Sequence, residues 1–293
     1  MKKYAFFLGC NIPIRIQQYA SSTKAVLKNL GVETKHISDF NCCGYPVRNI
    51  DEKSFLFSSA RNMALAEEKG FDILVMCNCC FQSLKTAKNT LSKDKGLLNE
   101  LNEILAKKGL KYQGTVKIKH FLSIIYHDIG IDFLKQSLIK TFNNLNIAVI
   151  YGCHILRPHE ITRFDNPFVP SILDELVEAT GACSIDWQGK LECCGASLTG
   201  INDKLSIIIL KEKLDAAKNA GADCIISVCS FCHIQFDTVQ KNICAEDNEL
   251  KILPAILYPQ LLGLCMGIDE KILGIEQNKT IKIKKGGYAP PFA

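Results

Sequence analysis

Residues 71–80 read FDILVMCNCC and residues 223–232 read DCIISVCSFC, and these two stretches decide the fold. In each, a short continuous apolar run, typical of a strand buried on both faces, leads directly into a Cys-x-x-Cys pair. An amphipathic segment ended by glycine precedes each run, over residues 59–69 and 204–220. Because glycine directly after a helix is a common stop signal, each stretch predicts a helix, a turn, a buried strand and a cysteine pair in that order.

The chain reads as a duplicated unit, because features of the first half recur in the second at an offset near 150 residues. The recurring features are an apolar run ending in Gly-Cys (residues 4–10 and 147–153), a helical segment ended by glycine (21–31 and 171–181), a polar–apolar alternation (33–37 and 183–187) and a Cys-Cys-Gly triplet (42–44 and 193–195). Strand, helix, strand, helix, strand in each half predicts an α/β fold. We expect two tandem domains related by a pseudo-twofold, each a small parallel sheet flanked by helices, over residues 1–143 and, with a C-terminal tail, 144–293.

Ten of the 15 cysteines fall into two matched sets of five. In the first set, Cys10 is followed after 31 residues by Cys42-Cys43, and after 33 more by Cys77 and Cys80. In the second set, 39 and 34 residues separate the corresponding members, which are Cys153, Cys193-Cys194, Cys229 and Cys232. Ligand sites in parallel α/β folds lie at the carboxyl ends of the strands, where these cysteines fall. We therefore expect both sets to face one central cleft.

Thiolate ligation of metal is the natural use of so many cysteines in a reducing compartment, where structural disulfides are rare. A structural zinc site is closed by four ligands, and a lone Cys-x-x-Cys pair is more often a zinc clip or two buried thiols. A fifth thiol from an adjacent pair does not suit one tetrahedral ion, because neighbouring side chains diverge. An iron–sulfur core removes this difficulty, since adjacent thiolates can bind different irons, and Gly44 and Gly195 let the backbone approach the sulfides. Five thiols that occur twice therefore favour iron–sulfur clusters.

With Cys-Cys-Gly in both copies, the sequence resembles the CCG-domain proteins, and among them the B subunits of CoB–CoM heterodisulfide reductases. The resemblance covers nearly the whole chain and is carried by YAFFLGC (4–10), RNMALAEEKGFDILVMCNCC (61–80), YGCHILRPHE (151–160) and VCSFCHIQFD (228–237). It implies two noncubane [4Fe-4S] clusters, between which the disulfide CoM-S-S-CoB is reduced to the thiols coenzyme M and coenzyme B. The implied ligands are, for the first cluster, Cys10, Cys42, Cys43, Cys77 and Cys80 and, for the second, Cys153, Cys193, Cys194, Cys229 and Cys232.

Five cysteines lie outside the two sets. Cys79 sits inside the first Cys-x-x-Cys pair, opposite Phe231 of the repeat, so we expect it not to be a ligand. The gaps of 33 and 34 residues before the Cys-x-x-Cys pairs are slightly shorter than is usual in the family. The other four have no counterpart in the opposite half, and we expect them to be buried apolar residues: Cys183, Cys224, Cys244 and Cys265.

The substrate that the resemblance implies is a small anionic disulfide carrying a sulfonate and a phosphate. Anionic groups call for nearby cations or helix N-termini. Basic residues beside the cysteines are therefore substrate-binding candidates: Arg48, His154, Arg157 and His233. An arginine can grip an oxyanion in a bidentate manner, and a histidine beside a cluster ligand can pass a proton. Each also has an ordinary interpretation as a surface cation or as a hydrogen-bond partner of a ligand.

Electrons must come from another protein, because no GxGxxG, P-loop or GxSxG motif occurs. The family implies an iron–sulfur partner, the C subunit, fed by a flavin-bearing A subunit. The net charge of +5 comes without a basic block, which argues against nucleic acid, and no apolar run has the length of a membrane span or a signal peptide, so we expect a cytoplasmic protein. Residues 91–111 predict a solvated helical insertion, and residues 279–293 an extended arm, loose or laid on a partner.

Two other functions stay open. A related CCG-domain reductase subunit would act on another disulfide or pass electrons onward; such proteins often carry a ferredoxin segment, and no CxxCxxCxxxCP run occurs here. A more distant alternative is a zinc-binding scaffold, which predicts about one or two zinc ions per chain and no iron. Metal analysis separates these alternatives.

Overall fold

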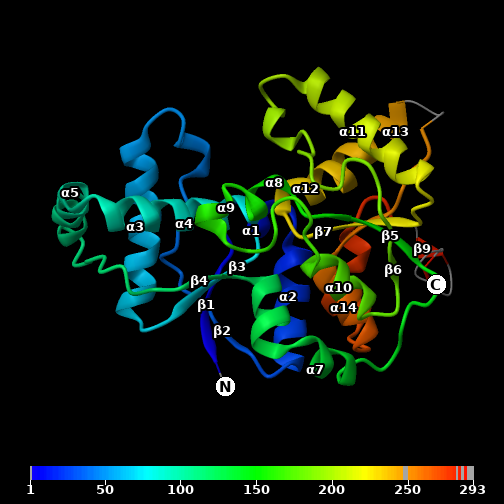
Figure 1. The fold of residues 1–293 in the computed structure, drawn as a ribbon, viewed down its shortest axis with the longest axis horizontal. Helices are drawn as coiled ribbons and strands as arrows, with labels where there is room; N and C mark the ends of the chain where they lie inside the picture. The colour runs from blue at the N-terminus through cyan, green and yellow to red at the C-terminus, as the bar shows by residue number, and fades with distance from the viewer. Residues whose placement is uncertain (1, 247–249, 282, 285–286, 289–293) are drawn as a thin grey trace.

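Two parallel four-stranded sheets with the same strand order form the framework of the protein (Figure 1). The structure, a computed structural model, describes residues 2–246, 250–281, 283–284 and 287–288. The sheets have the orders β2-β1-β3-β4 and β6-β5-β7-β8, and every neighbouring pair in them is parallel. The strands are β1 Lys3–Phe7, β2 Glu33–Lys35, β3 Asp72–Val75, β4 Ile118–His120, β5 Asn146–Ile150, β6 Cys183–Ser184, β7 Cys224–Ser227 and β8 Ala255–Leu257. The predicted α/β fold of two repeats is confirmed.

Helices flank both sheets. Those that belong with the first sheet are α1 Asn11–Arg15, α2 Gln17–Asn29, η1 Tyr45–Val47, α3 Glu52–Glu68, α4 Asn78–Lys93, α5 Lys95–Ala106, α6 Phe121–Ser123, η2 Ile124–Ile129 and α7 Ile131–Gln136. Those that follow in the second half are α8 Cys153–Leu156, α9 His159–Thr162, α10 Ile172–Glu178, η3 Ala196–Leu198, α11 Asp203–Asn219, α12 Ser230–Ile234, η4 Gln235–Val239, α13 Gln240–Glu246, α14 Tyr258–Cys265, α15 Glu270–Leu273 and η5 Ile275–Gln277.

The helix before the first Cys-x-x-Cys strand starts at Glu52, earlier than the predicted residue 59, whereas the helix before the second starts at Asp203, within one residue of the prediction. Asp51 caps α3, because its carboxylate accepts a hydrogen bond from the Ser54 N–H at 3.0 Å. Asn202 caps α11 in the same way, accepting from the Leu205 N–H at 3.1 Å. Such side-chain acceptors satisfy N–H groups that have no partner within the helix, so the two caps fix where these helices begin.

Each half has a fourth strand that the sequence does not predict. β4 lies beside β3, and β8 lies beside β7, in the same position of each sheet. Both strands have only three residues, which is too short for a recognisable alternation of polar and apolar residues. Glu67 holds the chain that leads into β4, since its carboxylate accepts hydrogen bonds from the N–H groups of Thr115 at 2.6 Å and Val116 at 3.0 Å.

A large hydrophobic cluster draws buried residues from both halves, and a further cluster lies within the second half. α14 and α15 of the second half pack against α2 of the first. Across the same region, the rings of Phe121 and Tyr258 have centroids 6.4 Å apart, and the Tyr126 hydroxyl donates to a Glu175 carboxylate oxygen at 2.7 Å. Figure 1 shows α2, α10 and α14 gathered together, with α3 and α11 on opposite sides of the molecule. The sheets are thus held in a fixed relation by buried side chains from both halves.

The predicted insertion and tail are both anchored in the protein. Residues 95–106 form α5, whose Leu101 and Leu105 are buried, so the insertion packs on the core rather than standing free in solvent. The tail is not loose at its start, because Thr280 is buried and its N–H donates to Asp237 Oδ1 at 2.9 Å. β9 Ile283–Lys284 then pairs antiparallel with β10 Gly287–Tyr288. Residues 282, 285–286 and 289–293 of this predicted arm lie outside the described residues.

In the part of the chain that the structure describes, no helix combines the length and the apolar character that crossing a bilayer requires.

Candidate metal centre

The Cys-x-x-Cys pairs occupy the junction between a buried strand and the helix after it. Cys77 follows β3 in an extended conformation (φ −86°, ψ 125°) and caps α4, whose first turn carries Cys80. Cys229 follows β7 in the same way (φ −123°, ψ 133°) and caps α12, whose first turn carries Cys232. A cap residue and the third residue of the helix lie on one face, so both thiols of each pair point to the same side.

The Cys-Cys-Gly turns require glycine. Gly44 and Gly195 have φ values of 86° and 81°, in the left-handed region that other residues seldom adopt. A Cβ at Gly44 would lie 2.9 Å from the Phe55 carbonyl oxygen, and one at Gly195 would lie 3.0 Å from the Ser206 carbonyl oxygen. The first turn is therefore pressed against α3 and the second against α11, and these contacts fix where the two preceding cysteines lie.

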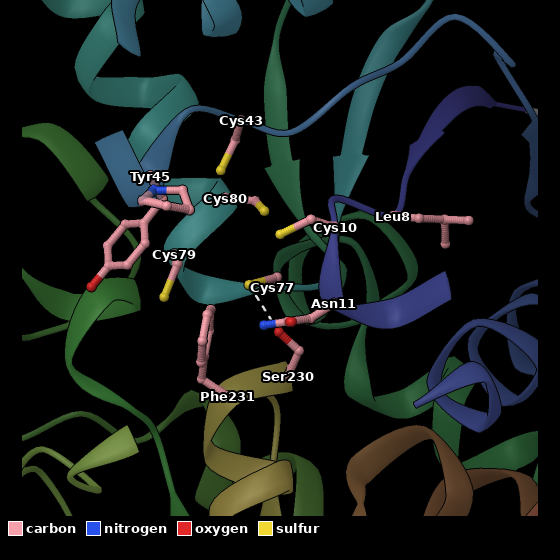
Figure 2. Close-up of a pocket in the computed structure, with 11 residues that line it drawn as sticks. Leu8, Cys10, Asn11, Cys43, Tyr45, Cys77, Cys79, Cys80, Ser230 and Phe231 are labelled. Carbon is pink, nitrogen blue, oxygen red and sulfur yellow. Dashed lines mark hydrogen bonds between the residues drawn. The ribbon is translucent and has the colours of Figure 1, made fainter. Parts of the chain in front are cut away.

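The structure brings the thiols of the first set together. Cys10 contacts Cys42, Cys43 contacts both Cys42 and Cys80, and Cys77 contacts Cys80. Around them lies a first cavity of about 270 Å³, shown in Figure 2. Its lining residues are Leu8, Cys10, Asn11, Cys43, Tyr45, Pro46, Cys77, Cys79, Cys80, Ser230 and Phe231.

The second set converges in the same pattern. Cys153 contacts Cys193, Cys194 contacts both Cys193 and Cys232, and Cys229 contacts Cys232. The second cavity has a volume of about 370 Å³. Its lining residues are Tyr45, Asn78, Cys79, Cys153, His154, Cys193, Cys194, Ala196, Ser197, Cys229, Phe231 and Cys232.

The two cavities adjoin each other. Tyr45, Cys79 and Phe231 line both of them. The sulfurs of Cys77, Cys79 and Cys229 lie within 4.8 Å of one another, although they come from different halves of the chain. The Ser230 hydroxyl donates to the Cys77 sulfur at 3.2 Å, which adds another contact between the halves (Figure 2).

Two buried side chains hold the halves in register at this junction. The Tyr19 hydroxyl lies 3.0 Å from the Met76 carbonyl oxygen and 2.7 Å from the Val228 carbonyl oxygen, so its single proton is shared between the residues that precede Cys77 and Cys229. The Asn78 amide donates to the Tyr151 carbonyl oxygen at 2.6 Å. The Tyr19–Val228 and Asn78–Tyr151 hydrogen bonds each join a side chain of the first half to the backbone beside the second cysteine set.

The crowded thiols perturb one another strongly. Accepting a hydrogen bond from Cys10 holds the pKa of Cys42 far below its usual range, whereas contact with Cys42 raises the pKa of Cys43. The second half repeats this, with the pKa of Cys193 low and the pKa of Cys194 high. Several buried sulfurs this close together cannot all be thiolates, because the cysteines themselves provide no positive charge to balance them. A bound cationic cluster would remove this conflict by taking all of them as thiolates.

The surroundings of the thiols also fit an iron–sulfur group. Asn11 Nδ2, beside the first cavity, is buried and has no hydrogen-bond partner among the described residues. The Gly195 N–H donates to the Cys193 sulfur at 3.4 Å, as backbone amides do toward cluster sulfurs. A Cβ at Gly9 would lie 2.8 Å from the Cys80 sulfur, so the chain passes as close to this thiol as glycine permits. Unpaired donors, close backbone and five mutually contacting thiols in each set suit a polynuclear cluster better than one tetrahedral ion.

One of the four predicted substrate-binding residues lines a cavity, and a second, Arg48, lines neither but stacks on the lining residue Tyr45. His154 lines the second cavity, with Nδ1 3.5 Å from the Cys79 sulfur and 3.4 Å from the Cys153 sulfur. Burial, and then the nearby charge of Arg48, lowers the pKa of His154. The Arg48 guanidinium lies 4.5 Å from the centroid of the Tyr45 ring and donates to Gln82 Oε1 at 3.0 Å.

The other two candidates lie elsewhere. Arg157 is exposed and donates to the Leu191 carbonyl oxygen at 3.3 Å, and it lines neither cavity. His233 is fully buried in α12 and also lines neither cavity. Its neighbours are Asp237 and Asn278. The geometry therefore gives no support to these two residues as substrate contacts.

Outside the two sets, the remaining cysteines differ from one another in burial. Cys224 and Cys265 are buried as the sequence predicts. The prediction for Cys183 is wrong, because this residue is exposed in the short edge strand β6, and Cys244 is only partly buried. Edge strands leave one side open to solvent, which explains the exposure of Cys183.

Lys213 is a residue near the second cavity that no sequence motif marks. Its side chain is 4% exposed, and its Nζ donates to the Gly189 carbonyl oxygen and lies 3.7 Å from a Glu192 carboxylate oxygen. Glu192 directly precedes the Cys193-Cys194 pair. The signal in the sequence is weak: Lys213 lies on the helix face that Leu210 and Leu214 mark as buried.

Comparison with known proteins supports the likeness stated from the sequence. A family model described as "Cysteine-rich domain" (CCG) matches residues 4–85 and 147–237. The chain is 36% identical to the B subunit of the ferredoxin/F420H2-dependent CoB–CoM heterodisulfide reductase of Methanosarcina acetivorans, over 97% of the chain and 96% of that protein. It is 30% identical to the 8-methylmenaquinol:fumarate reductase membrane anchor subunit of Wolinella succinogenes, over 97% of the chain and 99% of that protein.

A solved structure shares the fold. It is that of a hypothetical protein from Helicobacter pylori, which superposes with a TM-score of 0.79 at 18% sequence identity. The match covers 97% of the present chain and 53% of the other.

Proposed function

Because the chain belongs to the CCG cysteine-rich domain family, we propose that it is the iron–sulfur subunit of a disulfide reductase of the heterodisulfide reductase B type. The observation that carries the proposal is the meeting of two thiol-lined cavities, one with four and one with all five of its motif cysteines in the lining, where the Cys77, Cys79 and Cys229 sulfurs lie within 4.8 Å of one another. A disulfide has two sulfur atoms that must each be stabilised as the bond breaks. Two adjoining redox sites suit that reaction.

The proposed cofactors are two [4Fe-4S] clusters of the noncubane type. The residues that would hold the first cluster are Cys10, Cys43, Cys77 and Cys80, which line the first cavity, and Cys42, which contacts Cys10 and Cys43 beside it; those that would hold the second are Cys153, Cys193, Cys194, Cys229 and Cys232, which line the second cavity. When bound, the clusters would supply single electrons on both sides of the shared wall. Asn11 and the Gly195 N–H would donate hydrogen bonds toward sulfur.

The proposed substrate is the disulfide CoM-S-S-CoB, which would be released as two thiols. His154 would hold a proton or a hydrogen bond at the second cavity through Nδ1, the atom nearest the Cys79 and Cys153 sulfurs. Arg48 would add positive charge for an anionic group, since its guanidinium stacks on Tyr45 at the cavity wall. In this proposal, electrons reach the chain in the cytoplasm from an iron–sulfur partner of the C type, which a flavin-bearing partner of the A type supplies.

Metal and activity measurements on one preparation test the proposal. We expect protein purified without oxygen to hold about eight irons per chain, and to release thiols from CoM-S-S-CoB when given an artificial reductant. Cys229→Ala should lose iron and activity, whereas the matched variant Cys183→Ala, at an exposed thiol outside both cavities, should keep both. A preparation that binds zinc and no iron would contradict the proposal.

A second function is favoured by one comparison. The Wolinella relative, at 30% identity, is part of an enzyme named for menaquinol and fumarate rather than for a disulfide. Under this alternative the chain would hold its clusters but pass electrons to another protein of its complex. Iron-loaded protein that takes up electrons and releases no thiol from any disulfide offered would favour it.

A further inference from the structure

Three side chains form the wall between the two cavities. Tyr45, Cys79 and Phe231 each line both cavities, and we call them the partition. Figure 2 shows the Cys79 sulfur directed into the space beside the Tyr45 and Phe231 side chains. A molecule that extends from one cavity to the other must pass these three residues.

The partition breaks the symmetry of the duplicated chain. When the two cysteine sets are aligned, Cys79 corresponds to Phe231 and Tyr45 corresponds to Ala196. The ten motif cysteines are the same in both halves, but each of these pairs combines a small side chain with a large one. Each half thus contributes one aromatic ring and one small residue to the space between the cavities, and at the Cys-x-x-Cys position the small one is Cys79.

The aromatic members of the partition are held in place. The Arg48 guanidinium lies 4.5 Å from the Tyr45 ring centroid, and the His154 ring meets Tyr45 edge-on with centroids 5.1 Å apart. The Tyr45 and Phe231 rings have centroids 6.2 Å apart. Packed rings with several partners do not move aside at low cost. The space that remains for a passage is therefore the space that the short Cys79 side chain leaves.

We propose that Cys79 determines the width of the passage between the two cavities and that a disulfide spanning them lies against its sulfur. The proposal rests on the proposed function and adds to it a residue that selects substrates by size. Cys79 is not among the ligands that the family motif implies, and in this proposal its thiol, 3.5 Å from His154 Nδ1 and within 4.8 Å of the Cys77 and Cys229 sulfurs, keeps this role when the ten motif cysteines bind iron.

Chemical modification of the folded, iron-loaded chain is the first test. Methyl methanethiosulfonate transfers a methylthio group to a thiol and leaves as methanesulfinic acid, which makes a mixed disulfide without any added oxidant. We expect peptide mapping to find this group on Cys79, and we expect excess CoM-S-S-CoB to slow its addition at least tenfold. The exposed Cys183 serves as the internal control, because its modification should not respond to the disulfide.

Substitution at the same position is the second test. Cys79→Ser nearly preserves the size of the side chain, so it should raise the KM for the disulfide much less than a large residue at the same position does. Cys79→Leu fills the passage and should raise that KM roughly tenfold or more, with iron content and the cluster spectrum unchanged. If Cys79→Leu fails to fold, the wild-type chain can instead be treated with alkyl thiosulfonates of increasing size. Each attaches a larger alkylthio group to Cys79, so the passage becomes narrower step by step and the KM should rise with the size of the group.

The outcomes separate this inference from the proposed function. An iron-loaded wild-type chain that reduces the disulfide, while Cys79 resists the reagent or Cys79→Leu retains the wild-type KM, overturns the role of Cys79 and leaves the reductase intact. A wild-type chain that holds iron and reduces no disulfide overturns the reductase itself. Reactive Cys79, protection by the disulfide and a raised KM in Cys79→Leu together support the inference.

Discussion

At the scale of single residues, the site depends on buried polar groups that link the two halves. Tyr19 is the plainest case, because one hydroxyl proton serves the carbonyl oxygens of Met76 and Val228. Both carbonyls belong to residues directly before a Cys-x-x-Cys pair. The side chain thereby couples the backbone of one cysteine set to that of the other.

Tyr19→Phe should destabilise the protein. The substitution leaves the Val228 carbonyl without this donor, and a buried polar group left unpaired costs about 1–3 kcal/mol. The free energy of unfolding in urea measures the loss. Tyr126→Phe, which removes a half-exposed hydroxyl bonded to Glu175, is the matched control and should cost less. Equal losses in the two variants would argue against a special role for Tyr19.

Lys213→Met should lower the reduction potential of the cluster proposed for the second cavity. Reduction adds an electron next to the Cys193–Cys194 turn, and removing a buried positive charge from that turn makes the added negative charge less favourable. A redox titration followed by electron paramagnetic resonance measures this potential. Lys213→Arg should restore most of it, and Lys218→Met, at a more exposed lysine on the same helix, should not change it. An unchanged potential in Lys213→Met contradicts the prediction.

His120 should make the protein less stable in acid. Burial lowers the pKa of His120 to about 4, and its Nδ1 accepts from the Leu122 N–H at 3.3 Å, so the folded protein keeps the ring neutral. Between pH 6.5, the ordinary value, and pH 4 the unfolded chain binds the extra proton, so stability is full above this window and falls as the pH drops through it. The loss from pH 7 to pH 5 should be roughly 2 kcal/mol.

Urea unfolding at several pH values measures the effect of His120. His120→Gln removes the titrating ring and should flatten the decline, whereas His36→Gln, at an exposed position, should leave it as steep as in the wild type. A decline that persists unchanged in His120→Gln would assign it to other groups.

At the scale of elements, the Cys-Cys-Gly turns are the parts with the least tolerance. Gly44→Ala combines a left-handed backbone with a clash against the Phe55 carbonyl oxygen at 2.9 Å. We expect a loss of stability beyond the roughly 1–3 kcal/mol that left-handed strain alone costs, together with loss of iron from the first set. Gly70→Ala is the matched control, because Gly70 also has a positive φ and nothing lies within 4 Å of its added Cβ.

Iron content and urea unfolding of these two glycine variants give the comparison. Gly44→Ala with wild-type iron and with stability equal to Gly70→Ala would show that the turn adapts to a side chain. In that event the close packing of the turn on α3 would not be what fixes where Cys42 and Cys43 lie.

At the scale of the whole molecule, the predicted boundary between residues 143 and 144 divides two parts that pack through a common core. The second half covers α2 with α14 and α15, and Gln18 of α2 donates to Asn278 Oδ1 at 3.2 Å. Removing the second half exposes this surface. Two domains predicted as units of sequence are therefore joined physically by the helices that end the chain.

Residues 1–143 expressed alone should aggregate or unfold without cooperativity, because the apolar face of α2 would meet water. Residues 1–281, which keep α14, α15 and the buried Thr280, should unfold with nearly the wild-type free energy. Size-exclusion chromatography and urea unfolding distinguish the two fragments. A monomeric, cooperatively folded 1–143 fragment would show that each half is self-sufficient.

Much of the fold was predictable from local patterns. The runs at 73–76 and 225–228 and the glycine stops predict β3, β7 and the helices before them, since buried strands and helix ends have short-range signals. β4 and β8 were not predictable, because a strand of three residues is too short to show an alternation of polar and apolar residues. The exposure of Cys183 also depends on which strand is at the edge, and strand order is not a local property.

The sequence by itself determined the family, the repeated α/β plan and the two sets of five cysteines, because spacing and repetition are properties of the chain. Only the tertiary structure decided which residues outside those sets reach the centre. It placed Cys79, Tyr45 and Phe231 in one wall, set Lys213 behind the second cavity, and left Arg157 and His233 away from both. The direction and burial of a side chain depend on packing between distant segments, and that packing has no signature in the neighbouring residues.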